Sequence, residues 1–329
     1  MASSLANSLS IIRKEIVIYF VIPCFILGVI GGCLNVIIFL NLKTFRQSSC
    51  SFYLMIMSLF DIGRFFVNVL PYIMRFGYGI DWGLSSLFFC KLRFGMFTTC
   101  TLSSMTCLCL AVMDQYFATS FHIRWQQWCN IKLAHRLTTI FVFIWILHGI
   151  PYIILYDHII SPLTNTIVCQ LTNNILNQYT TYGYYIILTN LLPFITIVFG
   201  LMAYYNARHL AYRTVPLVRR ELDKQLTVMT LVQVLISFCV FVPFSTLNII
   251  SIFNTQQSDP VFQAILSLIG TITTDCFILS FTSPFYTYSC VSKRFRRQLK
   301  HVLYDVHVKR CQKNKIEPIQ IKTDGTTNS

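Results

Sequence analysis

The sequence predicts an all-α membrane protein, a seven-transmembrane helix bundle followed by a short amphipathic eighth helix. Seven long apolar stretches run from Val17 to Tyr288, and 55% of the chain is hydrophobic whereas only 12% is charged. A helix needs about 20 largely apolar residues to cross the hydrocarbon core, and in lipid every backbone polar group has to be hydrogen-bonded within the protein. A soluble protein would instead show helices with one apolar stripe.

Each of the seven stretches is long enough for one membrane-spanning helix. The predicted spans are Val17–Leu42, Ser51–Ile73, Phe88–Thr119, Ala134–Leu155, Tyr182–Tyr205, Lys224–Ile252 and Val261–Tyr288. The first of them is too long for the core of a signal peptide, so we expect an uncleaved anchor. The expected organisation is an extracellular N-terminus (1–16), the bundle (17–290), an amphipathic helix on the membrane surface (291–303) and a cytoplasmic tail (304–329).

The positions of the basic residues predict the orientation in the membrane. A net charge of +14 by itself would suggest a nucleic-acid partner, but the positions of the charged residues matter more than their sum. Most Lys and Arg residues follow the first, third, fifth and seventh spans: Lys43, Arg46, Arg124, Lys132, Arg136, Arg208, Arg213, Arg219, Arg220, Lys224 and ten more in the tail. The opposite loops 156–181 and 254–260 contain none. By the positive-inside rule the N-terminus is outside and the tail is cytoplasmic, and no nucleic acid is expected.

Two of the 13 cysteines are expected to form a disulfide. Most of the others lie within the spans or face a reducing cytoplasm. Cys90 and Cys169 are on the oxidising side, and apart from Cys24 near the outer end of the first span they are alone there. A bond between them would join the outer end of the third span to the second outer loop, and could stabilise the fold by ~4 kcal/mol on the chain-entropy model.

Four ionisable residues stand out within the spans, where such groups are costly and often functional. They are Asp61, Arg64, Asp114 and Asp275. Asp61 and Arg64 are three positions apart, hence on one helical face, and one interpretation is a pair that neutralises itself. The other is an aqueous cavity, a candidate cation site, lined by Asp61 together with Ser104 and Ser280 of the third and seventh spans. The spacing does not decide between them.

Prolines interrupt several of the spans, among them Pro71, Pro151, Pro193, Pro243 and Pro284. Each removes one intrahelical hydrogen bond and favours a bend, although membrane helices also tolerate proline without a functional reason. Prolines deep in the fifth, sixth and seventh spans are suited to a bundle whose inner ends move.

Together these residues resemble the rhodopsin-like (class A) G-protein-coupled receptors, over the whole chain up to Leu303. The matching residues, in register across the seven spans, are Asn35, Ser58-Leu59-Phe60-Asp61, Cys90, Asp114-Gln115-Tyr116, Trp145, Pro193, Phe241-Val242-Pro243, Ser283-Pro284-Phe285-Tyr286-Thr287 and Lys293-Arg294-Phe295-Arg296-Arg297. The resemblance implies a plasma-membrane receptor that passes the binding of an extracellular ligand to a heterotrimeric G protein.

The resemblance also assigns roles to the polar and proline residues. It implies a polar core formed by Asn35, Asp61, Ser104, Ser280 and Ser283. It implies that G-protein coupling and activation involve Asp114, Gln115, Tyr116, Asp223, Phe241, Pro243 and Pro284.

The chain departs from the family's pattern at three of these places. Gln115 stands where the family has an arginine that pairs with the preceding aspartate, and Asp223 matches the acidic partner at the base of the sixth span. A glutamine donates hydrogen bonds worth ~1 kcal/mol, less than a charged pair. This predicts either raised ligand-free activity or a different coupling geometry. Ser283 replaces an asparagine and Thr287 a tyrosine, so the polar core is altered too.

The sequence says less about the ligand than about the fold. The candidate pocket residues are Arg93, Phe97 and Phe241, and Phe97 occupies the position where receptors for biogenic amines carry an aspartate, which argues against a small amine. The seventh span has no lysine for a retinal Schiff base, so no cofactor is expected. Aromatic and mixed charged residues on the outer side favour a peptide, although tyrosines such as Tyr179 and Tyr182 also form ordinary interfacial belts.

Two other classes of membrane protein remain as alternatives. A transporter or channel would also combine seven spans with intramembrane charges, but carriers usually show internal repeats and none is visible here. An intramembrane zinc enzyme needs several deep histidines, and His148 alone qualifies. The chain is therefore expected to be neither an enzyme nor a metal protein.

The segment Val291–Leu303 is predicted to form an amphipathic helix on the inner leaflet. Phe295, Leu299, Val302 and Leu303 recur at the spacing of one apolar stripe. The basic residues on the other faces would contact anionic lipid headgroups. The alternative is a solvated basic tail without structure.

Overall fold

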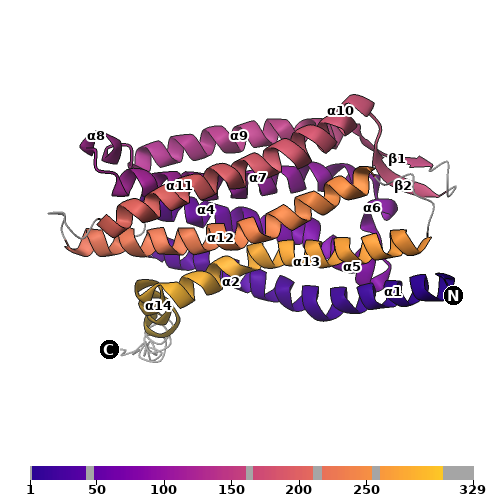
Figure 1. The fold of residues 1–329 in the computed structure, drawn as a ribbon, viewed down its shortest axis with the longest axis horizontal. Coiled ribbons are helices and arrows are strands. Elements are labelled where there is room, and N and C mark those ends of the chain that lie inside the picture. The colour runs from indigo at the N-terminus through magenta and orange to yellow at the C-terminus, as the bar shows by residue number, and fades with distance from the viewer. Residues whose placement is uncertain (1, 42–47, 161–165, 210–216, 254–259, 307–329) are drawn as a thin grey trace, which may run out of the picture.

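The computed structural model describes residues 2–41, 48–160, 166–209, 217–253 and 260–306. Seven of its helices are long and apolar enough to cross a membrane, which confirms the predicted bundle. They run side by side, with the start of α1 at the same end as the strands β1 and β2, and with α14 at the opposite end (Figure 1). We refer to these as the outer and the inner end.

The seven spans correspond to helices one to seven, several of which are built from two helical segments. Their bounds are α1 Ala2–Ile16 and α2 Ile22–Asn41 for helix one, α4 Ser49–Arg64 and α5 Leu70–Tyr78 for helix two, α7 Leu87–Thr119 for helix three, α9 Ile131–Leu155 for helix four, α10 Asn174–Gln178 and α11 Thr189–His209 for helix five, α12 Leu217–Phe253 for helix six, and α13 Pro260–Val291 for helix seven. Short helices α6 Trp82–Ser85 and α8 Ile123–Gln126 lie in the loops, and α14 Lys293–Lys300 follows helix seven.

The polar N-terminus differs most from the prediction. The first span was expected to begin at Val17, whereas the helix already begins at Ala2 and continues through that position. The extracellular location of residues 1–16 stays a prediction. Hydropathy detects only the part of a helix that lies in lipid, and the preceding residues contain neither Gly nor Pro to end a helix. Arg13 fixes this extension, because it donates a hydrogen bond to the Ser267 hydroxyl of helix seven at 2.6 Å.

Helices two and five contain wider, π-helical segments. Phe65–Val69 joins α4 to α5, and Tyr179–Leu188 joins α10 to α11, so helix five begins well before the predicted Tyr182. Segments of this kind bulge the backbone and are frequent at functional sites. They change which side chains face the bundle, a feature that periodicity at 3.6 residues does not predict.

Side-chain caps define where several helices begin. Ser48, Ser86, Asn130 and Asn173 each accept a hydrogen bond from a backbone N–H in the first turn of the helix that follows. These N–H groups have no partner within the helix, and the cap replaces water. Helix two ends at Gly79, whose φ of 74° is readily adopted only by glycine.

A β-hairpin, which the sequence analysis did not foresee, covers part of the outer end. Strands β1 Tyr156–Ile160 and β2 Ile167–Leu171 pair in antiparallel register, with His158 opposite Cys169. Cys169 forms the predicted disulfide with Cys90 at the start of helix three, which confirms that pairing. The ring of Tyr156 also stacks on Phe94, with the ring centres 4.0 Å apart. The hairpin is therefore attached to helix three at two points.

Helix three is the centre of the bundle. Within its most apolar window 72% of the residues are buried, against 17% for helix four, so helix four lies at the periphery. The two helices approach each other closely at Gly95 and Gly149, where a side chain would not fit. Small residues at such a contact let the backbones pack, which is a main source of association in lipid.

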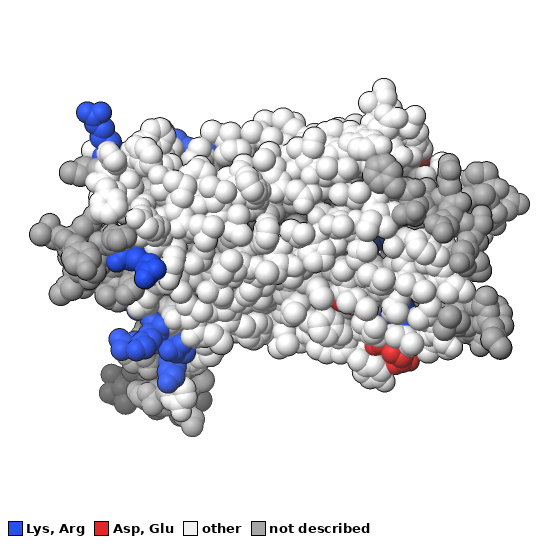
Figure 2. Space-filling view, viewed as in Figure 1, with Lys and Arg blue, Asp and Glu red and all other residues white. Residues whose placement is uncertain are grey.

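The short helix α14 begins at Ser292, whose hydroxyl accepts a hydrogen bond from the N–H of Phe295. The expected apolar stripe is present, but some of its residues pack against the bundle and others are exposed. Phe295 and Val302 are buried against the bundle, and Leu303 is exposed. On the face shown in Figure 2, Lys and Arg gather at the inner end that carries α14, and the middle of the bundle is almost without charge.

The contact between helices three and four gives a stability test. In Gly149→Ala the new methyl group would lie 2.5 Å from Thr99 Oγ1 and 2.9 Å from the Gly95 carbonyl oxygen. We expect a loss of ~1–3 kcal/mol from overpacking, measured as a lower melting temperature in detergent micelles. Gly270→Ala on helix seven is the matched control, because no heavy atom lies within 4 Å of its added methyl. Equal melting temperatures for both variants would contradict the close approach.

The disulfide gives a second test. Cys90→Ala and Cys169→Ala should reduce surface expression by similar factors, since either change removes the same bond. The double variant should add little to either single variant, because one interaction is lost only once. Clearly additive losses, measured by antibody labelling of an N-terminal tag on intact cells, would contradict a bond needed for folding.

Candidate functional site

A polar cluster lies in the middle of the bundle around Asp61 of helix two. The carboxylate, 4% exposed, accepts a hydrogen bond of 2.6 Å from the Ser104 hydroxyl of helix three. Asn35 of helix one donates to the Ser58 hydroxyl at 3.3 Å, one turn before Asp61. A cavity of about 30 Å³ adjoins Asp61 and Ser104, which is room for about two water molecules. The structure thus brings together three of the five residues expected in the polar core.

Arg64 is fully buried, yet its charge is not directed at Asp61. Its guanidinium lies over the ring of Phe281 on helix seven and near that of Phe277. Among the described residues no carboxylate comes within 4.0 Å of it, and its Nη1 has no hydrogen-bond partner. Aromatic faces attract a cation with ~2 kcal/mol or more in a desolvated setting. Arg64 and Asp61 still attract each other electrostatically, but the direct contacts of the guanidinium are with aromatic rings and not with the carboxylate.

The remaining core residues, Ser280 and Ser283, meet helix six through Gln233. The amide of Gln233 donates to the Ser280 carbonyl at 3.0 Å, and its oxygen accepts from the Ser283 hydroxyl at 3.4 Å. Pro284 explains this contact. Because proline has no N–H, the carbonyl four residues earlier, that of Ser280, lacks its helical donor. The Ser283 hydroxyl, at 2.8 Å, and the Gln233 amide both donate to this carbonyl, and the Gln233 contact joins helix seven to helix six at this point.

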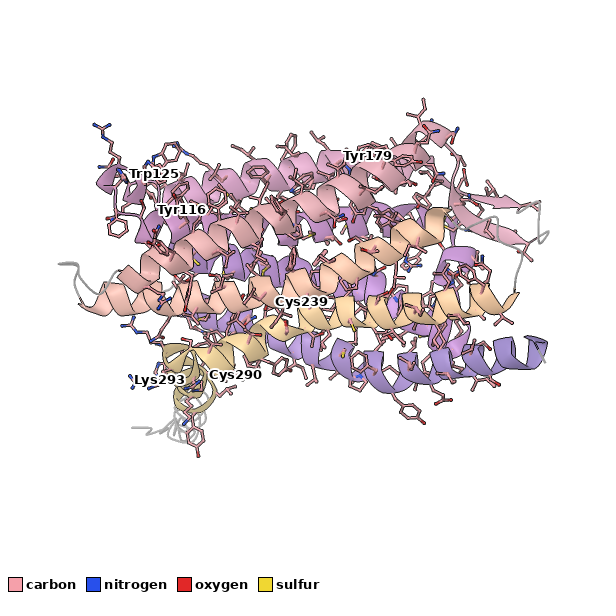
Figure 3. All side chains as sticks on the ribbon, in the orientation of Figure 1. Tyr116, Trp125, Tyr179, Cys239, Cys290 and Lys293 are labelled. Carbon is pink, nitrogen blue, oxygen red and sulfur yellow. A yellow bond between two sulfur atoms is a disulfide. The ribbon has the colours of Figure 1, made fainter. Side chains whose placement is uncertain are left out.

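A second group of contacts lies at the inner end of helix three. Asp114 accepts a hydrogen bond of 2.6 Å from Ser49 at the start of helix two. Gln115, 1% exposed, accepts one of 3.0 Å from the Thr227 hydroxyl of helix six. Tyr116 packs edge-on against Trp125 of the following loop, and both lie near the inner end in Figure 3. The three consecutive residues thus contact three different parts of the chain.

The expected contact between Gln115 and Asp223 remains a prediction, because the Asp223 side chain lies outside the described residues. Its position on α12 is one helical turn before Thr227, on the same side of the helix. Phe241 and Pro243 lie further along this helix. Phe241 is buried against Phe277 and adjoins the cavity beside Asp61.

The residues expected to line a ligand pocket, Arg93, Phe97 and Phe241, do not line the open cavity at the outer end. Arg93 lies over the ring of the adjacent Phe94, and Phe97 is half-buried on helix three. A cavity of about 390 Å³ opens instead between helices one, two, six and seven, lined by Arg13, Tyr72, Phe76, Leu247, Asn248, Gln263, Leu266, Ser267, Gly270, Thr271, Thr273 and Thr274. Its volume is in the range of small-molecule sites.

Comparison with known proteins identifies the fold. The family model described as "7 transmembrane receptor (rhodopsin family)" matches residues 31–296. The chain belongs to the rhodopsin family of receptors. No curated protein matches it in a sequence comparison. Rhodopsin-family proteins are multi-pass receptors of the plasma membrane and not enzymes, which agrees with the class expected from the sequence motifs. Among the described residues of this receptor, no three metal-ligating side chains gather into a cluster.

Three polar residues of this receptor were missed by the sequence analysis. They are Ser49, Thr227 and Gln233, each of which contacts an expected site residue. Neutral hydroxyl and amide groups are common in membrane helices, and nothing in their spacing distinguishes these three. One signal was available for Gln233, because Pro284 leaves a carbonyl without its donor and a long amide side chain on a neighbouring helix can replace it.

The contact between Gln115 and Thr227 can be measured with a double-mutant cycle. Gln115→Ala and Thr227→Val should each lower the melting temperature, and the double variant should lose less than the sum. We expect a coupling of ~1 kcal/mol for a neutral hydrogen bond, since both partners are buried. Thermal unfolding of the purified receptor in micelles gives the four values. Strict additivity would show that the two side chains do not interact.

Proposed function

We propose that the receptor converts the binding of an extracellular ligand into activation of a heterotrimeric G protein at its inner end. The proposal rests on three hydrogen bonds between helix six and its neighbours. Thr227 contacts Gln115 of helix three, Gln233 contacts helix seven, and Gln225 accepts a hydrogen bond of 3.0 Å from Ser292 at the start of α14. All three contacts join its inner half to a neighbour.

These contacts are neutral hydrogen bonds, and this sets how easily they break. Each contributes about 0.5–1.5 kcal/mol, so a ligand that binds an alternative arrangement with a few kcal/mol of preference would overcome them. Release of helix six would separate Thr227 from Gln115 and open the inner end next to Tyr116. A G protein would bind the surface that this movement exposes. The proline bends of helices five, six and seven are suited to such a motion.

The orientation that this function needs is supported by the charge distribution. Lys and Arg side chains gather at the end that carries α14, as expected for a cytoplasmic surface (Figure 2). The disulfide and hairpin lie at the other end, as expected for the oxidising side. We therefore place the N-terminus outside and the tail in the cytoplasm.

We also propose that α14 lies on the inner leaflet. Its first aromatic residue, Phe295, fixes it to the bundle, and the exposed Leu303 and Tyr304 that follow α14 are free to enter the headgroup region. The basic residues of Lys293–Lys300 would attract anionic lipids by ~1 kcal/mol each.

A peptide is the ligand class that we propose for the outer end. The outer cavity, the hairpin beside helix three and the partly exposed Tyr179 and Tyr182 provide an extended surface with aromatic and charged groups. A screen of peptide and lipid libraries for a calcium or cyclic-AMP response would test this. Responses to lipids alone would contradict it.

The function itself is tested by reconstituting the receptor in vesicles with a purified G protein. Ligand-free exchange of GDP for GTP should rise several-fold in Thr227→Val, because the hydrogen bond that holds helix six to Gln115 is lost. Thr230→Val is the matched control. Its hydroxyl is equally buried but bonds only to carbonyls of its own helix, those of Leu226 and Thr227, so exchange should stay unchanged. Solute uptake by the same vesicles without any nucleotide exchange would favour a transporter instead.

A further inference from the structure

Asp275 of helix seven is a buried acidic residue that has no role in the contacts described so far. Its side chain is 2% exposed, and its Oδ1 accepts a hydrogen bond of 3.3 Å from the Tyr72 hydroxyl of helix two. Its Oδ2 has no hydrogen-bond partner among the described residues. An intramembrane carboxylate with an unsatisfied oxygen is costly, and such residues usually mark a site for a ligand or an ion.

The position of Asp275 connects it to the outer cavity. Tyr72, its hydrogen-bond donor, lines that cavity, and so do Thr271 and Thr274 of the same turn of helix seven. The Asp275 carboxylate is not itself part of the cavity lining. It contacts the lining residue Tyr72, so a group in the cavity would have to displace the Tyr72 hydroxyl to reach it.

Arg13 provides a charge of the opposite sign near the outer end of the same cavity. Its guanidinium donates to the Ser267 hydroxyl and lies over the Phe76 ring at 3.9 Å, and both partners are neutral. Ser267 precedes Asp275 by eight residues, a rise of ~12 Å along the helix. The neighbouring Arg75 forms an ion pair of 3.2 Å with Asp81, so its charge is already compensated.

We propose that this cavity binds a dipolar ligand whose cationic nitrogen, an ammonium or guanidinium group, pairs with Asp275 while an anionic group of the same ligand pairs with Arg13. This deepens the proposed receptor function by naming the chemistry of the ligand. A short peptide with a free N-terminal ammonium group has the required charges and length. The position is distinct from Phe97 of helix three, where the absence of an aspartate argues against a small amine.

The physical basis is the low polarity of the surroundings. Opposite charges that meet in a site shielded from water attract each other several-fold more strongly than in solvent. In the absence of a ligand, the charges of Arg13 and Asp275 attract each other, but among the described residues they form no ion pair within 4.0 Å. A ligand with the complementary arrangement would satisfy both of them at once and replace the bond between Tyr72 and Asp275. It would also join helices one, two and seven at their outer halves.

The charge of the cavity can be measured without knowing the ligand. Thr271→Cys places a thiol in the cavity wall of the full-length receptor in intact cells. Its labelling rate is compared for two probes of similar size, the cationic aminoethyl methanethiosulfonate and the anionic sulfonatoethyl methanethiosulfonate. We expect the cationic probe to react about tenfold faster after correction for intrinsic reactivity, because Asp275 concentrates cations. The chain without the added cysteine gives the background of the native thiols.

A second substitution in the same chain shows which charged residue causes the preference between the two probes. Asp275→Asn in the Thr271→Cys chain should abolish the preference for the cationic probe, and Arg13→Gln should enlarge it. Ser85→Cys, on the exposed outer helix α6, should show no change with either substitution. Should Thr271→Cys fail to reach the surface, Thr274→Cys tests the same wall.

Two results would overturn the proposal. The first is a charge preference that persists in Asp275→Asn, which would mean that Asp275 is neutral and serves only as a structural partner of Tyr72. The second is an unreactive cavity position beside a reactive Ser85→Cys, which would mean that the cavity is closed to ligands. The labelling needs no G protein, so its outcome is independent of the nucleotide-exchange assay.

Discussion

The rest of the structure depends on one constraint, that a polar group within the apolar bundle has to find its partner inside the protein. In lipid an unsatisfied group costs several kcal/mol, because no water is available to replace the partner. Pro284 and Asp61 are each accompanied by a specific contact for this reason. Pro284 frees the Ser280 carbonyl and Gln233 binds it, and Asp61 is paired with Ser104. The polar contacts thus lie where a helix has an unpaired carbonyl or a buried carboxylate, and they fix how the helices face one another.

The same constraint describes how helix six is attached to its neighbours. Its inner half is joined to three neighbours, but only by neutral amides and hydroxyls such as Gln115, Thr227 and Gln233. A charged pair in the same place would be harder to break and costly to leave unpaired. Where the family has an arginine, this receptor has the neutral Gln115, which contacts the Thr227 hydroxyl of helix six.

The outer end is organised differently, by covalent and aromatic contacts. The disulfide between Cys90 and Cys169 and the stacking of Tyr156 on Phe94 hold the hairpin over helix three. The cavity lined by Arg13 and Tyr72 opens on the other side, between helices one, two, six and seven, and Tyr72 contacts Asp275 of helix seven. Helix seven contacts helix six through Gln233, so the two ends of the receptor are physically connected.

The sequence by itself determined the seven spans, the disulfide and a short helix after the seventh span, because hydropathy, compartment and local periodicity act within short segments of the chain. It also identified Asp61 with Ser104, since ionisable groups in lipid are rare enough to stand out. Only the tertiary structure decided that Arg64 faces Phe281 instead of Asp61, that Gln115 meets Thr227, and that Asp275 contacts Tyr72, which lines a cavity. These contacts join residues far apart in the chain, and they depend on how each helix is rotated about its axis. The π-helical segments of helices two and five change that rotation, and a pattern that assumes 3.6 residues per turn cannot predict it.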